Sequence, residues 1–195
     1  LKDLTFDNIY HEHYNYWSLT SLVNFFKQFN STIYKAERIN THGGSIRIYI
    51  KKGKKIKAEY NIKELLKEEE IFGIKKYKTY KDFGEKINKL KENVMQNINK
   101  LKKDNKKIVG FGAPAKATTA LNFFGITNQI DWVIEDNKLK QDKFIPGVLI
   151  PIKNKKFLKD KNTLILVLAW NFFKEIKENN SNLNAVFVNI KDLEN

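Results

Sequence analysis

The chain has 195 residues, a formal net charge of +14 at pH 7 and no cysteine, so it can form one sizeable domain with or without a smaller attached unit. The absence of cysteine excludes disulfide bonds, thiolate nucleophiles and cysteine metal sites, and it is compatible with a reducing, cytoplasmic setting. No apolar run approaches the roughly 20 residues of a membrane span and no signal peptide is visible, so we expect no membrane partner.

A positive charge of this size is typical of nucleic-acid binders, because clustered lysines can neutralise phosphates. The arginines are few, no nucleic-acid fold motif is present, and the lysines are spread over Lys51 to Lys57, Lys75 to Lys81, Lys86 to Lys107 and Lys138 to Lys161. We therefore interpret the charge as solvated surface and expect no nucleic-acid partner. A basic nucleic-acid-binding domain remains an alternative.

The densest chemistry lies in the stretch Phe6 to Ser21, FDNIYHEHYNYWSLTS. His11 and His13 flank Glu12, and aromatic residues surround all three, namely Tyr10, Tyr14, Tyr16 and Trp17. Apolar rings beside ionisable groups displace their pKa values, which is what a proton-transfer site needs. Two other interpretations stay open: a histidine that is only structural, and a metal site, which we do not expect because no third ligand lies near the two imidazoles.

A helix is predicted to begin where this cluster ends. Ser18 or Thr20 can cap it, and its apolar residues recur at near 3.6 spacing, at Leu19, Leu22, Val23, Phe26 and Phe29. This places Tyr10 to His13 in a loop or turn that feeds a rigid element. Ser31 to Ile39 and Ser45 to Ile50 are predicted strands of an antiparallel pair, with a bend at Gly43-Gly44 between them.

Residues 53–105 are predicted to form a helical connector. Lys51 to Tyr60 is a polar loop and Ile62 to Ile71 a short helix. A long amphipathic helix follows, with its apolar stripe at Phe83, Ile87, Leu90, Val94, Ile98 and Leu101. We expect this stripe to dock on a neighbouring domain rather than to form a coiled coil.

The remaining residues alternate between predicted strands and helices. The strands are Lys107 to Phe111, Ile130 to Ile134, Val148 to Ile152, Leu164 to Ala169 and Ala185 to Val188; the helices are Ala115 to Phe124 and Phe172 to Asn179. Such alternation predicts an α/β fold with a Rossmann-like parallel sheet and flanking helices. In the sequence, the antiparallel strand pair and the helical connector precede this sheet.

The turn between the first of these strands and its helix is a candidate ligand site. Gly112 and the small Ala113 let a ligand approach the backbone, the helix start favours an anion, and Lys116 adds positive charge. Pro114 suits the first helical position. Ala115 stands where the dinucleotide fingerprint has its third glycine, so a plain strand-to-helix turn is the alternative.

Three further polar residues follow strand ends. Glu135 and Asp136 end the second strand, where an acid commonly receives ribose hydroxyls, or where both acids merely cap the next turn. Asn171 lies just past a strand's carboxyl end, the ligand side of such sheets, although it can equally be a helix N-cap.

Five blocks of this sequence resemble the S-adenosylmethionine-dependent sugar C-methyltransferases, in the family's order and at about its spacing. The blocks are FDNIYHEHYNYWSLTS, THGGSIRIYI from Thr41, VGFGAPAKATTALN from Val109, IEDNKLKQDKFIPGVLIPI from Ile134 and LAWNF from Leu168. Enzymes of this family methylate a carbon of a nucleotide-linked keto-sugar. The resemblance implies that the carboxy-terminal domain holds the nucleotide-sugar, with contacts from Gly112, Ala113, Lys116 and Asn171, to which the strand end adds Glu135.

The resemblance also assigns candidate catalytic roles. Tyr10, Glu12 and His13 match the family's active-site motif, and His11 lies between them. His13 is the candidate base that removes the proton from the sugar carbon next to the ketone. Tyr10 would donate to the developing enolate oxygen, and Glu12 would orient or buffer the base.

The family carries a cysteine-rich zinc-binding domain and a cofactor-binding glycine motif ahead of this region, and these 195 residues contain neither. With a start at Leu1 rather than Met, we expect a fragment or processed chain. We expect residues 1–52 to be the tail of the methyltransferase core, residues 53–105 to be the helical connector and residues 106–195 to be the substrate domain. Alone it should bind substrate but stay inactive, unless the missing core supplies the S-adenosylmethionine site in cis or in trans. A noncatalytic nucleotide-sugar-binding module is the alternative, and an oxidoreductase is poorly supported.

Overall fold

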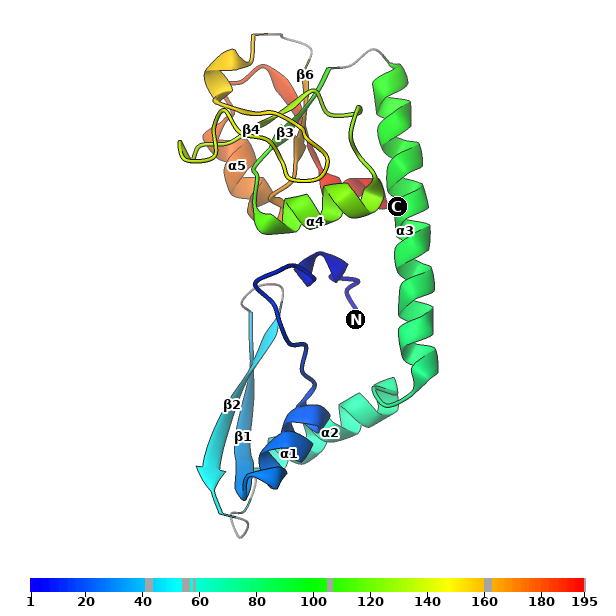
Figure 1. The fold of residues 1–195 in the computed structure, drawn as a ribbon, viewed down its shortest axis with the longest axis vertical. Coiled ribbons are helices and arrows are strands. Elements are labelled where there is room, and N and C mark those ends of the chain that lie inside the picture. Colours follow the sequence, from blue (N-terminus) through cyan, green and yellow to red (C-terminus); the bar gives the residue numbers. More distant parts are fainter. Residues whose placement is uncertain (41–43, 54–56, 58, 105–106, 160–162, 195) are drawn as a thin grey trace. The chain divides into compact units, whose positions relative to one another are not determined.

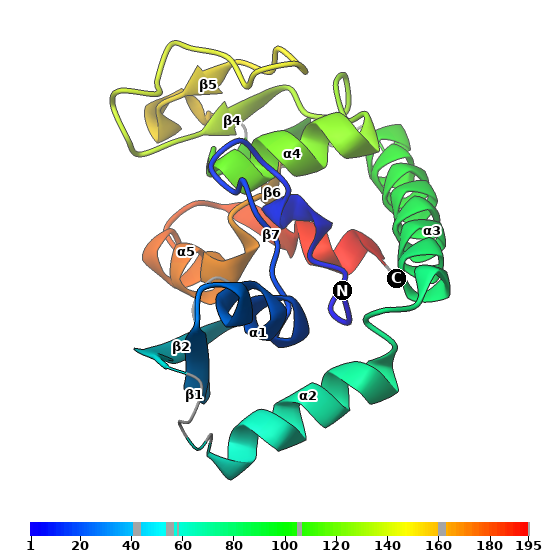
Figure 2. The same ribbon diagram turned by 60° about the horizontal axis from the view of Figure 1, so that its bottom comes forward.

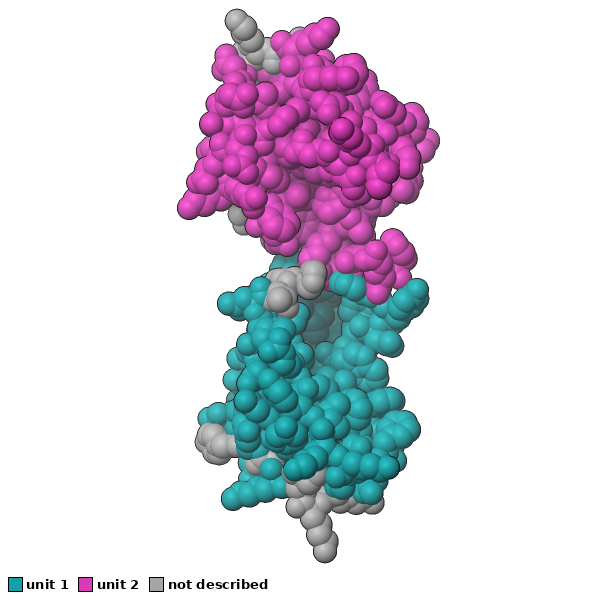
Figure 3. All heavy atoms as spheres, turned by 90° about the vertical axis from the view of Figure 1, so that its left-hand side faces the viewer, with its two compact units in different colours: residues 1–5, 13–84 teal, residues 6–12, 85–195 magenta. Residues whose placement is uncertain are grey.

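The chain divides into two units in the computed structural model (Figure 1, Figure 3). The first unit comprises Leu1–Thr5 and His13–Gly84, and the second comprises Phe6–Glu12 and Glu85–Asn195. The structure describes residues 1–40, 44–53, 57, 59–104, 107–159 and 163–194. Gly43, which contributes to the predicted bend, lies outside them.

Two helices pack with a strand pair in the first unit. The elements are α1 (Leu19–Gln28), β1 (Ser31–Ile39), β2 (Ser45–Lys52) and α2 (Tyr60–Phe72). The strands pair in antiparallel register, from Ser31 opposite Lys52 to Ile39 opposite Ser45, with one irregularity between Ile33 and Lys35. Their shared core consists of Leu19, Ile33, Ala36 and Ile62. The predicted helices and antiparallel pair are thereby confirmed, and β2 continues to Lys52, into the predicted loop.

Two sets of hydrogen bonds fix the start of α1. Ser18 is the N-cap: its hydroxyl accepts from the N–H of Ser21, whose own hydroxyl oxygen accepts from the N–H of Ser18. Glu69 of α2 adds a second cap, because its two carboxylate oxygens accept from the N–H groups of Leu19 and Thr20, each at 2.7 Å. The helix that follows the chemical cluster is therefore held at its first turn by both local and distant residues.

The long helix α3 runs over Tyr77–Lys103 and begins before the predicted apolar stripe. The stripe is buried at Ile87, Leu90, Val94 and Ile98. Asn93 and Asn97, one turn apart, donate to the backbone carbonyls of Glu194 and Leu193 in the second unit, at 3.1 Å each. The carboxy-terminal part of α3 thus docks on the sheet unit, as predicted.

Five parallel strands form the sheet of the second unit, in the order β5-β4-β3-β6-β7. They are β3 (Lys107–Phe111), β4 (Trp132–Ile134), β5 (Ile152–Lys153), β6 (Thr163–Val167) and β7 (Ala185–Asn189). The chain builds outward from β3 in one direction and returns to add β6 on its other side. This is the strand order of a Rossmann-like sheet, so the predicted fold class is confirmed, and its switch point lies between β3 and β6.

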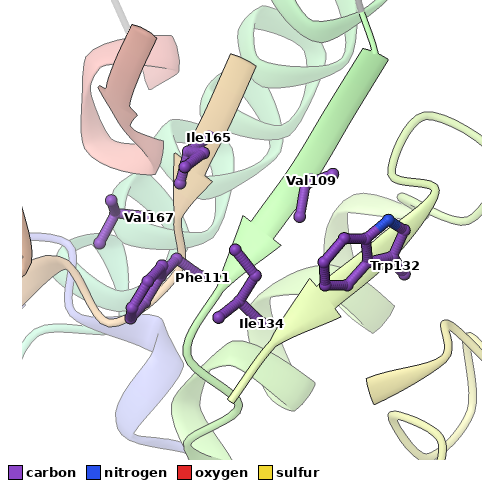
Figure 4. Close-up of a cluster of buried hydrophobic side chains, with 6 residues drawn as sticks. All are labelled: Val109, Phe111, Trp132, Ile134, Ile165 and Val167. Carbon is purple, nitrogen blue, oxygen red and sulfur yellow. The ribbon is translucent and has the colours of Figure 1, made fainter. Parts of the chain in front are cut away.

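Alternate side chains of the central strands make one apolar layer (Figure 4). The buried members are Val109, Phe111, Trp132, Ile134, Ile165 and Val167. Phe173 and Ile176 of α5 (Phe173–Asn179) pack against this layer, so α5 covers that face. The other predicted helix of the unit, α4 (Ala115–Phe124), has the predicted bounds and follows β3 directly.

The predicted strand Val148 to Ile152 is wrong in its position, since β5 begins only at Ile152. The preceding residues form a turn, in which the N–H of Ile145 donates to the carbonyl of Ile150 and Leu149 donates back to Ile145, both at 2.9 Å. Leu149 has φ 55°, outside the strand region. Pro146 begins the turn, and this local bend overrides the strand preference of the apolar residues behind it.

Candidate functional site

The Phe6 to Ser21 stretch begins as a short 3-10 helix, η1 (Phe6–Asn8), turns at Tyr10–Glu12, and runs without regular structure to the cap of α1. The predicted loop that feeds a rigid helix is confirmed. The boundary between the two units falls between Glu12 and His13. The four candidate catalytic residues therefore divide, with Tyr10 among those of the second unit and His13 in the first.

We expected the aromatic residues to enclose the ionisable ones, and the structure shows that they do not. The side chains of His11 and Glu12 are 83% and 66% exposed, with 3.9 Å between Nε2 and Oε1. Tyr14, Tyr16 and Trp17 are exposed as well, and Trp17 packs on Phe25 of α1 instead. Successive residues of an extended segment point in different directions, so closeness in sequence does not bring these rings around the histidine.

Tyr10 and His13 are the better enclosed members of the motif. Both are half-buried, in contrast to His11 and Glu12. The Tyr10 ring lies edge-on to the His11 ring at 6.1 Å between centroids. The motif therefore combines two enclosed groups with two that solvent reaches.

Packing on α4 holds the beginning of the motif in the second unit (Figure 2). The buried ring of Phe6 lies 4.8 Å from that of Phe123 and 5.4 Å from that of Phe124. The hydroxyl of Thr119 donates to the carbonyl of Ile9 at 3.5 Å. The Tyr10–Glu12 turn is thus attached to the helix that follows the candidate substrate turn.

Lys116, a predicted substrate contact, faces this segment. Its ammonium lies 3.7 Å from Oδ2 of Asp7, and the two side chains are 14% and 2% exposed. Asp7 was not among the predicted site residues, because an acid in a mixed stretch gives no sign of burial. Its partner is far away in the chain, so only the fold could identify the pair.

The switch point of the sheet has close backbone packing. Gly112 has φ 88°, and a Cβ built on it would lie 2.9 Å from the Cβ of Ala169. Its N–H donates to the carbonyl of Ile134 at 2.8 Å. A residue without a side chain is therefore required where β3 ends beside the segment that follows β6.

Both oxygens of the Glu135 carboxylate are engaged in local hydrogen bonds. Oε2 accepts from the N–H of Ala113 at 2.9 Å and Oε1 from the N–H of Asn137 at 3.0 Å. The ammonium of Lys140 donates to the carbonyl of Ala113 at 2.8 Å. Glu135 thus caps its own turn, one of the two interpretations of its position, and it also holds the β3–α4 turn. Asp136 is exposed.

Asn171 lies in η3 (Trp170–Phe172), just after β6, and is exposed. The N-cap of α5 is Phe172, which makes no side-chain cap bond. Asn171 is therefore not the helix cap that the alternative interpretation required. The residue itself follows the carboxyl end of β6, at the position in the chain that was predicted.

Two cavities adjoin these residues. One of about 300 Å³ is lined by Phe111, Asp136, Lys155, Phe172, Glu175, Ile176, Asn179 and Asn180. The other, of about 220 Å³, is lined by Ala113, Thr118, Leu139, Lys140, Lys143, Phe144, Ile145, Pro146 and Ile152. Both include residues at or just beyond strand ends, so there is room for a ligand at the carboxyl edge of this sheet.

Among the described residues, no three His, Asp or Glu side chains come together as a metal site would require. His42 is outside that set. No helix of the described parts combines the length and the apolar character needed to cross a membrane.

Comparison with known proteins identifies relatives of this chain. Residues 40–188 match the family model described as C-methyltransferase C-terminal domain. The chain is also similar to the C-methyltransferase NovU of Streptomyces niveus, with 31% identity over 185 residues. That similarity covers 92% of this chain and 43% of NovU, so the chain spans less than half the length of this relative.

Proposed function

The chain belongs to the C-methyltransferase C-terminal domain family, and from that premise we propose its function. It is the carboxy-terminal part of an S-adenosylmethionine-dependent enzyme that methylates a carbon of a nucleotide-linked keto-sugar. The observation that carries the proposal is the switch point of the parallel sheet, where Gly112 and Asn171 flank the carboxyl edge. Open α/β sheets bind ligands at this position.

The sheet unit holds the nucleotide-sugar in this proposal. Gly112 gives the substrate turn its shape, because its missing side chain leaves room for Ala169, and the small Ala113 lines the cavity of about 220 Å³. Asn171 offers an exposed amide. Each Glu135 oxygen keeps a second lone pair, so the carboxylate can accept a ribose hydroxyl while it caps the turn.

The Tyr10–His13 motif supplies the proton chemistry. His13 removes the proton from the sugar carbon beside the ketone, Tyr10 donates to the enolate oxygen, and Glu12 orients the base. Such positioned proton transfer contributes about 10²- to 10⁴-fold to a rate. His11 lies between these residues and is the most exposed of the four, with its side chain 83% exposed.

S-adenosylmethionine supplies the methyl group. Over its described residues the first unit has an antiparallel strand pair and no glycine-rich turn between a parallel strand and a helix. We therefore assign none of these residues to the cofactor, whose site belongs to the remaining methyltransferase core.

The first unit also carries a surface on which that core can pack. Trp17, Phe25 and Phe29 are exposed, with ring centroids 5.3 Å and 5.0 Å apart along the row. Among the described strands, β1 pairs only with β2 and β2 only with β1. An exposed aromatic row beside open strand edges is the kind of surface that a larger domain covers.

Calorimetric titration of the chain with a nucleoside-diphosphate keto-sugar, and separately with S-adenosylmethionine, tests the proposal. We expect the sugar nucleotide to bind and the cofactor not to bind. Asn171→Ala should weaken the sugar nucleotide about fivefold, the equivalent of one neutral hydrogen bond of about 1 kcal/mol. Asn184→Ala is the matched control, since Asn184 is equally exposed but precedes β7. Tight cofactor binding without sugar-nucleotide binding would contradict the assignment.

A further inference from the structure

The pair formed by Asp7 and Lys116 has an unusual environment for charged groups. The Asp7 side chain is 2% exposed and that of Lys116 is 14% exposed, with 3.7 Å between Oδ2 and Nζ. Neither carboxylate oxygen of Asp7 has a hydrogen-bond partner among the described residues. Taking both charges out of water is costly, and the attraction between them offsets the cost only with good geometry and further hydrogen bonds. A well-packed apolar pair would stabilise the unit at least as well, so stability alone does not explain these residues.

The ring of Trp170 lies near this pair, and a second lysine contacts the same ring. The ammonium groups of Lys116 and Lys191 lie 6.0 Å and 5.1 Å from the centre of the Trp170 ring. Lys191 pairs in turn with Glu194 at 2.6 Å. Asp7, Trp170, Lys191 and Glu194 help to line a cavity of about 10 Å³, the size of about one water molecule. Because the Asp7 side chain is only 2% exposed, bulk solvent cannot replace Lys116 as its partner.

The location of the pair connects the two candidate parts of the site. Lys116 is the second residue of α4, directly after the turn that begins at Gly112. Asp7 lies in η1, three residues before Tyr10. Phe6 contacts Phe123 and Phe124 at the other end of α4. The segment is thus attached to α4 near both ends of the helix, once by rings and once by charge.

A direct contact between Lys116 and the substrate would disrupt this arrangement. If the Lys116 ammonium bound a substrate phosphate instead of Asp7, the Asp7 carboxylate would remain buried without its counter-charge, which is strongly unfavourable. The low exposure of Lys116 also leaves little of the side chain within reach of a ligand. Both facts indicate that Lys116 acts through its ion pair with Asp7 and not through contact with the substrate.

We propose that Asp7 and Lys116 are positioning residues, whose ion pair holds the Tyr10–Glu12 turn in a fixed place relative to the substrate turn at Gly112. The inference rests on the proposed function, and it replaces the expected contact between Lys116 and the substrate. Lys116 does not contact the substrate in this proposal. It holds in place the groups that transfer the proton.

Steady-state kinetics of the complete methyltransferase, with its core in cis or added in trans, test this role. Asp7→Asn and Lys116→Met should each lower kcat about 10- to 100-fold, as a small misplacement of catalytic groups does, and change KM for the sugar nucleotide less than about twofold. The double variant should be no worse than the poorer single variant, because both changes remove one interaction. Lys174→Met, at an exposed pair with Glu178 on α5, is the matched control and should leave kcat unchanged.

Hydrogen exchange of the unliganded chain gives a readout that is independent of activity. Backbone amides at residues 9–12 should exchange at least tenfold faster in Asp7→Asn and Lys116→Met, while those of β3 and β6 keep their protection. If a single variant fails to fold, the double variant is measured instead, since it leaves no lone buried charge. Unchanged exchange at residues 9–12 would overturn the inference. So would a large rise in KM for Lys116→Met alone, whereas a wild-type enzyme without methyl transfer would contradict only the proposed function.

Discussion

The carboxylate of Glu135 accepts a hydrogen bond of 2.9 Å from the backbone N–H of Ala113, and thereby ties the end of β4 to the turn between β3 and α4. The same carboxylate accepts from Asn137, and Lys140 donates to the carbonyl of Ala113. The turn at the switch point is therefore held in shape before any ligand arrives. Such preorganisation lowers the entropic cost of binding.

Replacing Glu135 with alanine should destabilise the sheet unit by about 1–3 kcal/mol, because the N–H of Ala113 is then left without its acceptor in a partly buried turn. Chemical denaturation of the chain measures the change. Asp136→Ala is the control: this adjacent acid is exposed, and its replacement should alter the free energy of unfolding by less than about 0.5 kcal/mol. Equal effects of the two substitutions would show that the turn does not depend on Glu135.

Gly112→Ala should destabilise the unit more than Gly125→Ala does, by about 1–3 kcal/mol. Both glycines have positive φ, at 88° and 76°. Only at Gly112 does the new Cβ meet a neighbour, the Cβ of Ala169 at 2.9 Å, whereas the site at Gly125 is open. Comparison of the two variants by thermal unfolding separates the steric clash from the backbone strain. Similar losses in both would contradict the close approach of β3 and β6.

Removal of the Glu69 carboxylate should fray the first turn of α1. Two N–H groups, those of Leu19 and Thr20, lose their acceptors in Glu69→Ala, with an expected cost of about 1–3 kcal/mol to the first unit. Hydrogen exchange at these two amides measures the opening directly. Glu70→Ala, at the exposed neighbouring position, should leave their protection unchanged. Protection that survives in Glu69→Ala would show that Ser18 alone suffices as the cap.

The strand pair contains a carboxylate whose titration depends on its neighbours. Hydrogen bonds from Lys35 and then from Tyr49 lower the pKa of Glu37 below 4.5. The bond from Tyr49 is 2.8 Å long. A depressed pKa means that this stabilisation is fully present above pH 4.5 and is lost as the pH falls through the lowered value. The strand pair should therefore resist mild acid and weaken below that value.

The partner group titrates in the opposite sense. Glu37 raises the pKa of Lys35 above 10.5, through their hydrogen bond and then through charge attraction. The Lys35 contribution is therefore present below pH 10.5 and lost as the pH rises through the raised value.

NMR titration of the Glu37 carboxyl carbon tests the acid side. Tyr49→Phe should move the pKa of Glu37 upward, and Tyr34→Phe should not. A Glu37 pKa at or above 4.5 in the wild type would contradict the assignment.

Much of the fold was predictable from local pattern. The strand Lys107–Phe111 and the helix Ala115–Phe124 have the predicted bounds, because an apolar run, a glycine turn and helical spacing follow one another there. The start of α3 at Tyr77 was not predicted, since its first residues are polar and precede the stripe. The strand expected at Val148 failed because the turn beginning at Pro146 leads Leu149 to positive φ.

The candidate site was predictable only in its local chemistry. The motif at Tyr10–His13 and the turn at Gly112 are visible as short runs of residues. The pairs that hold them in place, Asp7 with Lys116 and Glu69 with the first turn of α1, join distant segments. A single sequence contains no signal for such pairing, because each member is an ordinary charged residue until the chain folds.

Transfer of a carbon-13-labelled methyl group from S-adenosylmethionine to a nucleoside-diphosphate keto-sugar, by the complete methyltransferase, tests the proposed function most directly. NMR of the product should show the labelled methyl bonded to a sugar carbon beside the ketone. His13→Gln should abolish the transfer and leave folding and sugar-nucleotide binding intact. A methyl group on oxygen, or full activity of the His13→Gln variant, would contradict the account.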